Sequence, residues 1–283
     1  MHTLPFERST GPVCVLERHA LVEVPLSEIG PLRDAAVPEG APALPARFLR
    51  HCDEQTVVGV RAVLEAIAGD PQPVEAFARY GVIAAPRCAG RIAAAETLAA
   101  AAQAGSVAVS PHVVPQCSLH AAASAVSVAL GMHGPNLGSS GGPEALSEGL
   151  CTALSLVHAS GCAGLWLVLS EWDEEPALDP AGRPLDDPLC RAVALALGSR
   201  AAAPPDAVTF TLRAGDRAVE HRPAPPGAPS ALAAFSAALG MCAAGGAIAA
   251  WSHVCPWGAE IRVAAPAVGV RTPPTGLASR EAA

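Results

Sequence analysis

The segment from Cys162 to Ser170 constrains the fold more strongly than any other part of this chain. Its sequence, CAGLWLVLS, is an unbroken apolar run that ends in a polar residue. Such a run is typical of a strand that is buried on both faces of an α/β sheet. A predicted helix over residues 143–160 precedes it and ends at Gly161, with apolar residues at helical spacing at Leu146, Leu150, Leu154 and Val157. The sequence therefore predicts a buried helix followed by an inner strand.

Helical and strand-like segments alternate along the rest of the chain. Helical spacing predicts helices over residues 46–68, 91–104 and 118–130. Apolar runs predict strands over residues 13–24, 80–85, 106–110, 189–197, 207–213 and 260–263. Residues 13–24 could form one long strand or a pair of strands. Residues 207–213 alternate between apolar and polar side chains, as expected at a sheet edge. The acidic, Pro-rich residues 171–187 predict a solvated loop. This alternation predicts a layered α/β domain over residues 1–265, with helices covering a mixed sheet, and a disordered tail over 266–283.

Charge and cysteine usage exclude several classes of function. All 18 basic residues are arginine and the formal net charge is −8, so lysine chemistry is absent and no basic stripe favours nucleic acid. The nine cysteines are scattered, and no C-x-x-C pair indicates a zinc ribbon or a thioredoxin-type site. Scattered cysteines and an N-terminus without an apolar signal core indicate a cytoplasmic protein. We expect neither a metal nor a cofactor.

One uncharged segment, Leu232 to Trp251, has the length of a membrane span. It consists mostly of Ala, Gly and Ser, which contribute little to membrane insertion compared with Leu, Ile or Phe. We therefore expect a tightly packed, buried helix here rather than a membrane helix.

Three motifs between Ser110 and Leu169 follow one another in an informative order. An S-P-x-x-x-P sequence at residues 110–115 opens an Ala/Ser-rich helix, and ALGMHGPNL at residues 129–137 leads into a Gly/Ser turn. A long helix and the apolar run CAGLWLVLSEW, ending near Glu171, come next. This order resembles the N-terminal half of a β-ketoacyl synthase. More loosely, residues 47–68 resemble the family's early helix, and residues 251–263 are similar to the close of short, stand-alone chain-length-factor-like proteins. The resemblance implies a thiolase-like α/β fold.

The chain departs from that family where the chemistry takes place. The family has a nucleophilic cysteine at the turn that follows the Gly-Pro pair. The corresponding position here is Pro143 or Glu144, and no cysteine lies between Cys117 and Cys151. The family's catalytic histidine motifs are also absent. Condensation of acyl thioesters by this chain alone is therefore not expected, and whether the chain is an enzyme at all stays open.

The resemblance instead implies a non-catalytic partner in fatty-acid or polyketide-type biosynthesis. It implies a homodimer, or a heterodimer with a ketosynthase, with acyl carrier protein nearby. In thiolase-like dimers the strand before the nucleophile turn lies at the interface. We therefore expect contacts at His133, Gly134, Pro135, Asn136, Leu137 and Gly138.

The same turn supports a rival interpretation with repurposed chemistry. Residues 138–142 fit G-x-S-x-G, the nucleophile elbow of hydrolases, with Ser140 at its centre. An acyl transferase or serine hydrolase would also need an acid and a histidine, for which the candidates are Asp173 or Asp206 and His221 or His253.

Other polar groups near the turn have simpler explanations. Glu144 and His133 are further candidates for acid–base roles, but an acidic residue in a first helical turn needs no other cause. A metal site at His112, His120 and His133 is disfavoured by the irregular spacing, and these side chains are better explained as loop and core histidines.

Overall fold

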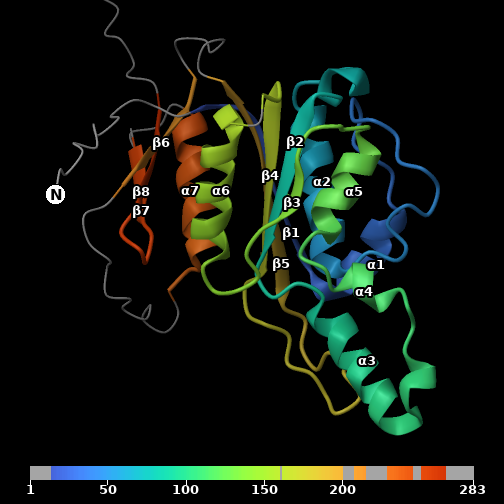
Figure 1. The fold of residues 1–283 in the computed structure, drawn as a ribbon. Helices are drawn as coiled ribbons and strands as arrows, with labels where there is room; N and C mark the ends of the chain where they lie inside the picture. The colour runs from blue at the N-terminus through green and yellow to red at the C-terminus, as the bar shows by residue number, and fades with distance from the viewer. Residues whose placement is uncertain (1–13, 160, 200–206, 215–227, 245–249, 266–283) are drawn as a thin grey trace, which may run out of the picture.

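A computed structural model of the protein describes residues 14–159, 161–199, 207–214, 228–244 and 250–265. These residues form a mixed, eight-stranded sheet in the order β3-β2-β4-β5-β1-β6-β8-β7 (Figure 1). The strands are β1 (Cys14–Pro25), β2 (Tyr80–Pro86), β3 (Asn136–Gly138), β4 (Gly164–Trp172), β5 (Leu189–Ser199), β6 (Thr209–Arg213), β7 (Ala250–Val254) and β8 (Glu260–Ala264). The helices are α1 (Leu26–Asp34), α2 (Glu54–Ala68), α3 (Arg91–Ala104), α4 (Val113–Gln116), α5 (Ala121–Ala129), α6 (Ala145–Ala159) and α7 (Ala231–Ala243), with 3-10 turns η1 (Val74–Phe77) and η2 (Ser106–Ala108).

Strand β4 lies at the centre of the sheet, as its apolar sequence predicts. It runs parallel to β2 on one side and antiparallel to β5 on the other, and all nine of its residues are buried. Trp166 and Val168 point into the core beneath α2 and α5, whereas Leu165, Leu167 and Leu169 point into the core beneath α6 and α7. The apolar run is continuous because both faces of the strand are covered by helices.

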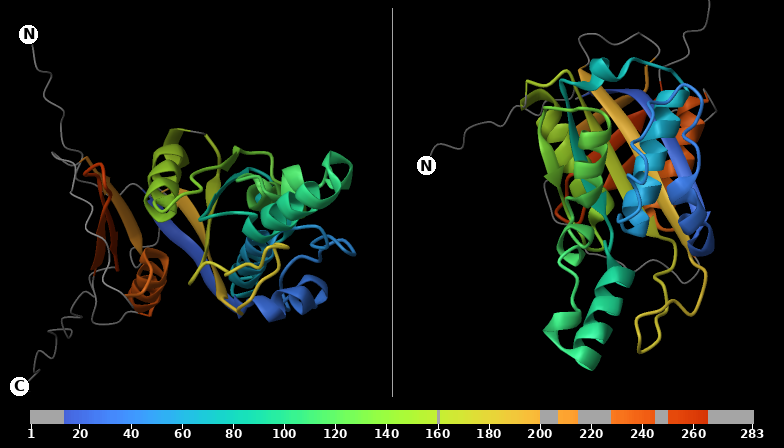
Figure 2. Two further views of the ribbon diagram at one scale, coloured as in Figure 1. Left: turned by 90° about the horizontal axis from the view of Figure 1, so that it is seen from below. Right: turned by 90° about the vertical axis from the view of Figure 1, so that its right-hand side faces the viewer.

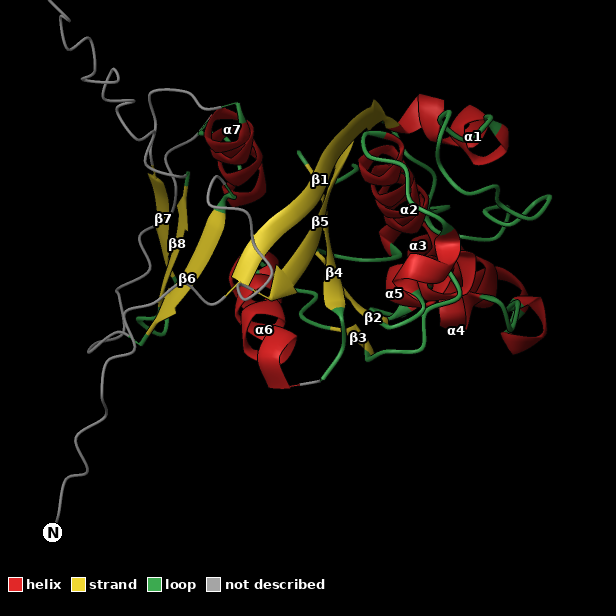
Figure 3. Ribbon diagram, turned by 90° about the horizontal axis from the view of Figure 1, so that it is seen from above, coloured by secondary structure: helices red, strands yellow, loops and turns green. Residues whose placement is uncertain are grey.

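The last three strands form a separate layer. We call strands β3, β2, β4, β5 and β1 the main sheet and strands β6, β8 and β7 the outer sheet. The outer sheet lies on the far side of α6 and α7 from the main sheet (Figures 1 and 3). In the described part of the chain, the strand pairing between β1 and β6 consists of two residue pairs, Cys14 with Phe210 and Val15 with Thr209. Beside them, the Leu16 N–H donates to the Val208 carbonyl (2.9 Å). Phe210, Ile261 and Val263 complete the core around α6 and α7. The order of layers is therefore helix, main sheet, helix and outer sheet.

Several predicted elements are confirmed, and others begin or end elsewhere. One long strand forms at β1, and α3 has its predicted bounds. Helix α2 begins at Glu54 rather than Ala46, because the Asp53 carboxylate accepts a hydrogen bond from the Thr56 N–H and caps the helix there. Helix α5 begins at Ala121, after the short α4, and α6 begins at Ala145, two residues after Pro143.

Four predictions are wrong in ways that have a structural cause. Residues 106–110 contain the turn η2 instead of a strand, since no strand among the described residues pairs with them. Strand β6 lies between β1 and β8, so the edges of the sheet are β3 and β7. Glu171 belongs to β4 and is buried, not part of a solvated loop. Helix α7 ends at Ala243, and Trp251 lies in β7.

The remaining sequence expectations concern the membrane and the tail. No helix in the described part of the chain has the length and apolar character needed to cross a membrane. The predicted tail over residues 266–283 lies outside the described residues.

Candidate functional site

The carboxyl ends of three parallel strands meet at one edge of the main sheet. Strand β2 pairs in parallel with both β3 and β4, so the segments that follow all three strands emerge together. Backbone hydrogen bonds connect them. Arg87 N–H donates to the Ser170 carbonyl (2.7 Å), Ser139 N–H to the Ala84 carbonyl (2.8 Å), and Cys88 N–H to the Gly141 carbonyl (3.1 Å). In open α/β sheets, ligands bind in the crevice outside such carboxyl ends.

Two of the three non-glycine residues with positive φ in the described part of the chain lie at the same edge, the third being Arg47. Ser140 and Cys88 both have a left-handed backbone conformation, with φ values of 69° and 57°. Such a conformation costs a non-glycine residue about 1–3 kcal/mol, and strained residues of this kind gather at functional sites. The strain and the strand ends together make this edge the candidate functional site.

The turn after β3 packs closely against the loop that precedes α5. A Cβ atom on Gly138 would lie 2.5 Å from the backbone carbon of Leu119, and one on Gly141 would lie 2.7 Å from the Leu119 side chain. Glycine is needed at Gly138 because a neighbouring backbone occupies that space. This packing accounts for Gly138 of the G-x-S-x-G pattern without a nucleophile, whereas a Cβ atom on Gly142 would meet open space.

Ser140 makes no hydrogen bond to a histidine or an acid in the described part of the chain. Its Oγ atom is buried and has no hydrogen-bond partner among the described residues. His253 instead contacts Ser147 of α6, with 2.8 Å between Nε2 and Oγ, and Glu144 approaches the same hydroxyl at 3.3 Å. Asp173 is paired with Arg191 at 3.3 Å. The other two candidates, Asp206 and His221, lie outside the described residues.

Of the three histidines weighed as a metal site, His112 and His120 line one pocket and His133 lies in another. His120 Nδ1 lies 2.9 Å from the Ser124 hydroxyl, and the His112 ring stacks on His51 at 5.8 Å. Both line a surface pocket of about 280 Å³ that also includes Cys52. His133 lines a different pocket, beside Cys162. Within the described part of the chain, no group of three His, Cys, Asp or Glu residues is placed to hold a metal ion.

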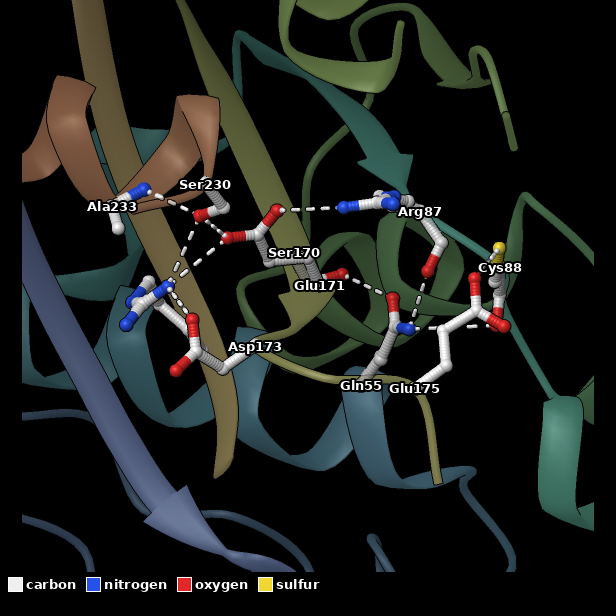
Figure 4. A network of polar contacts seen from close by, with 10 residues as sticks. Gln55, Arg87, Cys88, Ser170, Glu171, Asp173, Glu175, Ser230 and Ala233 are labelled. Carbon is white, nitrogen blue, oxygen red and sulfur yellow. Dashed lines mark hydrogen bonds and ion pairs between the residues drawn. The ribbon is translucent and has the colours of Figure 1, made fainter. Parts of the chain in front are cut away.

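A buried polar network lies beneath the candidate site (Figure 4). Arg191 of β5 donates hydrogen bonds to Glu171 of β4 (3.1 Å) and to Asp173 (3.3 Å), and it also pairs with Glu23 of β1. Only 8% of the Arg191 side chain and 5% of the Glu171 side chain are exposed. Ser230 donates to Glu171 and accepts from the Ala233 N–H, which caps α7. The network thereby holds β1, β4, β5 and α7 together.

The electrostatics of Glu171 reflect this position. Burial raises the pKa of its carboxyl group, while the hydrogen bonds from Ser230 and Arg191 lower it. Arg87 lies 3.9 Å from the same carboxylate. On its other side, Ser170 donates to Gln55, whose side chain donates to the Arg87 carbonyl (2.7 Å).

Sequence reasoning missed most of this network, although a signal was present. Arg191 interrupts the otherwise apolar run of β5, and Glu171 follows the apolar run of β4. A charge inside an apolar strand indicates a buried ion pair, because an unpaired buried charge is strongly unfavourable. The sequence around Cys88 contains no comparable signal for its left-handed backbone conformation, because that conformation depends on the contact of Cys88 with Gly141 in the turn after β3.

An open sheet edge and exposed apolar residues lie beside the site. Strand β3 pairs only with β2, so its other edge has no partner among the described residues, and Leu137 is 40% exposed. Of the eleven large apolar residues that are exposed in the described part of the chain, six lie in α3, η2, α4 and α5, in β3 or beside them. These six are Leu98, Val107, Val114, Leu119, Val128 and Leu137, and we call them the apolar face. Helix α3 extends beyond the end of the sheet (Figure 2).

Comparison with known proteins reveals the fold. No family model and no curated protein matches the sequence. Among solved structures, the chain is similar to the structure of the ketosynthase ApeO in complex with its chain length factor ApeC from Xenorhabdus doucetiae. The TM-score is 0.53 and the sequence identity is 17%, and the match covers 88% of this chain and 99% of the matched chain. The chain is also similar to a β-ketoacyl synthase from Burkholderia phymatum STM815, with a TM-score of 0.48 and 17% identity over 75% of this chain and 67% of that one. The first likeness confirms the predicted fold class: a β-ketoacyl synthase-like, thiolase-like α/β fold.

Proposed function

We propose that this chain is a non-catalytic, chain-length-factor-like partner of a ketosynthase in polyketide-type or fatty-acid-type biosynthesis. The observation that carries the proposal is the open edge of β3 beside the apolar face, on a chain with the ketosynthase-like fold. The similar structure from Xenorhabdus doucetiae contains a ketosynthase together with its chain length factor, which supports the choice of partner.

The chemistry at the strand ends supports a non-catalytic role. The turn over residues 136–148 contains no cysteine, and Ser140 has no base beside it in the described part of the chain. Cys88 is a thiol at this edge, but burial and a hydrogen bond to Glu175 raise its pKa. A thiol with a raised pKa is a poor nucleophile at neutral pH, because the thiolate is the reactive species.

The edge of β3 supports an interface that extends the sheet into the partner. An unpaired edge exposes backbone N–H and C=O groups that another strand can bond. The Asn136 side-chain oxygen is also buried without a hydrogen-bond partner in the described part of the chain. Leu119, Val128 and Leu137 lie in β3, in α5 or just before α5, which packs against β3, and they would bury large side chains in the same contact. Such burial is the main source of association free energy. We therefore propose residues 133–138, with α5 beside them, as the interface.

The experiment is co-expression with each ketosynthase of the source organism in turn, followed by size-exclusion chromatography with light scattering. We expect a complex with the mass of one copy of each chain. Leu137→Arg introduces a charge into the buried contact and is expected to weaken the complex at least ~10-fold.

Val254→Arg is the matched control. Val254 is 48% exposed but lies in β7, at the opposite edge of the sheet from β3, so this variant is expected to bind normally. A wild-type chain that stays monomeric beside the ketosynthase contradicts the proposal, and equal binding by both variants contradicts the placement at β3.

A further inference from the structure

Two cysteines from distant parts of the sequence are in contact between α6 and the outer sheet. The Sγ atoms of Cys151 and Cys255 are 3.8 Å apart, although 104 positions separate the two residues. Cys151 lies on α6 and is half-buried, whereas Cys255 follows β7 and is fully buried. Two sulfur atoms at this distance are in direct contact, with no space for another atom between them.

The surrounding contacts hold both cysteines in place. Cys255 N–H donates to the Ala259 carbonyl (2.7 Å), and the Cys255 carbonyl accepts from Gly258 N–H (2.8 Å), which fixes the β7–β8 turn. One helical turn before Cys151, the Ser147 hydroxyl lies 2.8 Å from His253 Nε2 of β7. The contact between α6 and β7 is therefore fixed at two successive turns of the helix.

We propose that Cys151 and Cys255 form a redox-modifiable dithiol whose disulfide fastens the outer sheet to α6. The bond requires the two sulfur atoms to approach by about 1.8 Å, which small rotations of the two side chains supply. This inference concerns the chain by itself and does not depend on the proposed partner.

The reaction balances with a disulfide oxidant such as oxidised glutathione. The Cys151 thiolate, the more accessible of the two, attacks a glutathione sulfur and expels one glutathione thiolate, which takes up the proton that Cys151 lost. The Cys255 thiolate then attacks Cys151 and expels the second glutathione. Two protein thiols are oxidised to one disulfide, and one glutathione disulfide is reduced to two thiols.

The rate of this exchange follows from burial. Burial raises the pKa of Cys151 to about 12 and also raises the pKa of Cys255. Because the thiolate is the attacking species, closure should be slow at neutral pH and faster in alkaline buffer. Oxidation for the test is therefore carried out at about pH 8.5.

The disulfide has a thermal consequence that can be measured. A cross-link between positions 104 residues apart restricts the unfolded chain and should raise Tm by about 5–10 °C. The rise should be reversed by a reductant.

The test is mass spectrometry of the full chain after treatment with oxidised glutathione and capping of free thiols. Since the chain has no lysine, trypsin leaves Cys117, Cys151 and Cys162 on one fragment, whereas chymotrypsin cuts at leucines between them. Chymotrypsin also separates Cys242 from Cys255 at Trp251. We expect a chymotryptic peptide pair that joins Cys151 to Cys255, and the rise in Tm.

Cys151→Ser should lose both signals, while the matched control Cys162→Ser, which removes another half-buried cysteine of the same tryptic fragment, should keep them. Recovery of Cys151 as a stable glutathione adduct, or of both thiols unmodified in folded protein, overturns the proposal. Circular dichroism confirms that each variant is folded.

Discussion

Replacement of Arg191 by methionine tests whether the buried network stabilises the fold. The substitution keeps most of the side-chain volume but removes the cation that is paired with Glu171, whose side chain is only 5% exposed. Breaking a buried ion pair by removing one partner costs about 3–5 kcal/mol, since the remaining charge is desolvated.

The local geometry places the expected value at the lower end of that range. Arg87 lies 3.9 Å from the Glu171 carboxylate and Ser230 still donates to it, so Glu171 keeps some compensation. Glu23 and Asp173 are 35% and 46% exposed, so water takes over their contacts with Arg191. We expect Arg191→Met to lower the free energy of unfolding by about 3 kcal/mol in urea titrations followed by tryptophan fluorescence.

The pH dependence of this loss has a defined sign. Burial already raises the pKa of Glu171, and removal of Arg191 raises it further. A carboxyl group whose pKa is higher in the folded than in the unfolded state loses stability as pH rises through the folded value. The deficit of Arg191→Met relative to wild type should therefore be larger at neutral pH than near the pKa of an unfolded Glu, about 4.3.

Two further variants complete the test. The double variant Arg191→Met/Glu171→Gln removes the stranded charge and should recover about 2 kcal/mol of the loss. Arg91→Met, which removes a surface partner of Glu175, should change the free energy of unfolding by less than about 0.5 kcal/mol. A loss below about 1 kcal/mol for Arg191→Met, or no recovery in the double variant, refutes the reasoning.

Two other predictions concern the helix and the turn at the candidate site. A Cβ atom on Gly149 would lie 2.6 Å from the Cβ atom of Ala85. Gly149→Val should therefore force α6 away from the sheet and lower the free energy of unfolding by about 2–3 kcal/mol. An unchanged urea midpoint would contradict this packing. Ser140 should not react with a fluorophosphonate probe, since no base activates it in the described part of the chain, and labelling that Ser140→Ala abolishes would favour the hydrolase interpretation.

The local elements of this fold were predictable because short-range signals determine them. The apolar run of β4 and the glycine after α3 both act within a few residues, and both predictions match the structure. The start of α2 was predicted eight residues too early, because apolar spacing continued upstream of the Asp53 cap. Capping by Asp53 was visible in the sequence and is the stronger signal.

The site was less predictable because it depends on contacts between distant segments. Cys88 adopts its strained conformation against Gly141, and Arg191 is stabilised by Glu171 and Glu23 from other strands. The spacing of residues along the sequence does not indicate which distant residues will be partners of this kind. The interface prediction for residues 133–138 remains a proposal, although the open edge of β3 lies within that range.

Hydrogen exchange should separate the two sheets by stability. Residues 164–170 of β4 lie between two paired strands in the core, whereas the outer sheet pairs with β1 through two residue pairs and ends at β7. Local opening of β7 and β8 thus breaks few contacts with the main sheet, so their amides should exchange at least ~10-fold faster than those of β4 and β5. Within the outer sheet, β8 should be the more protected strand, since Ile261 and Val263 are buried against α6 and α7.

Oxidation of Cys151 and Cys255 should slow exchange in β7 and β8 and leave β4 unchanged, because the cross-link restrains only the outer layer. Equal protection of β7 and β4 in the reduced protein would show that the two sheets unfold as one unit.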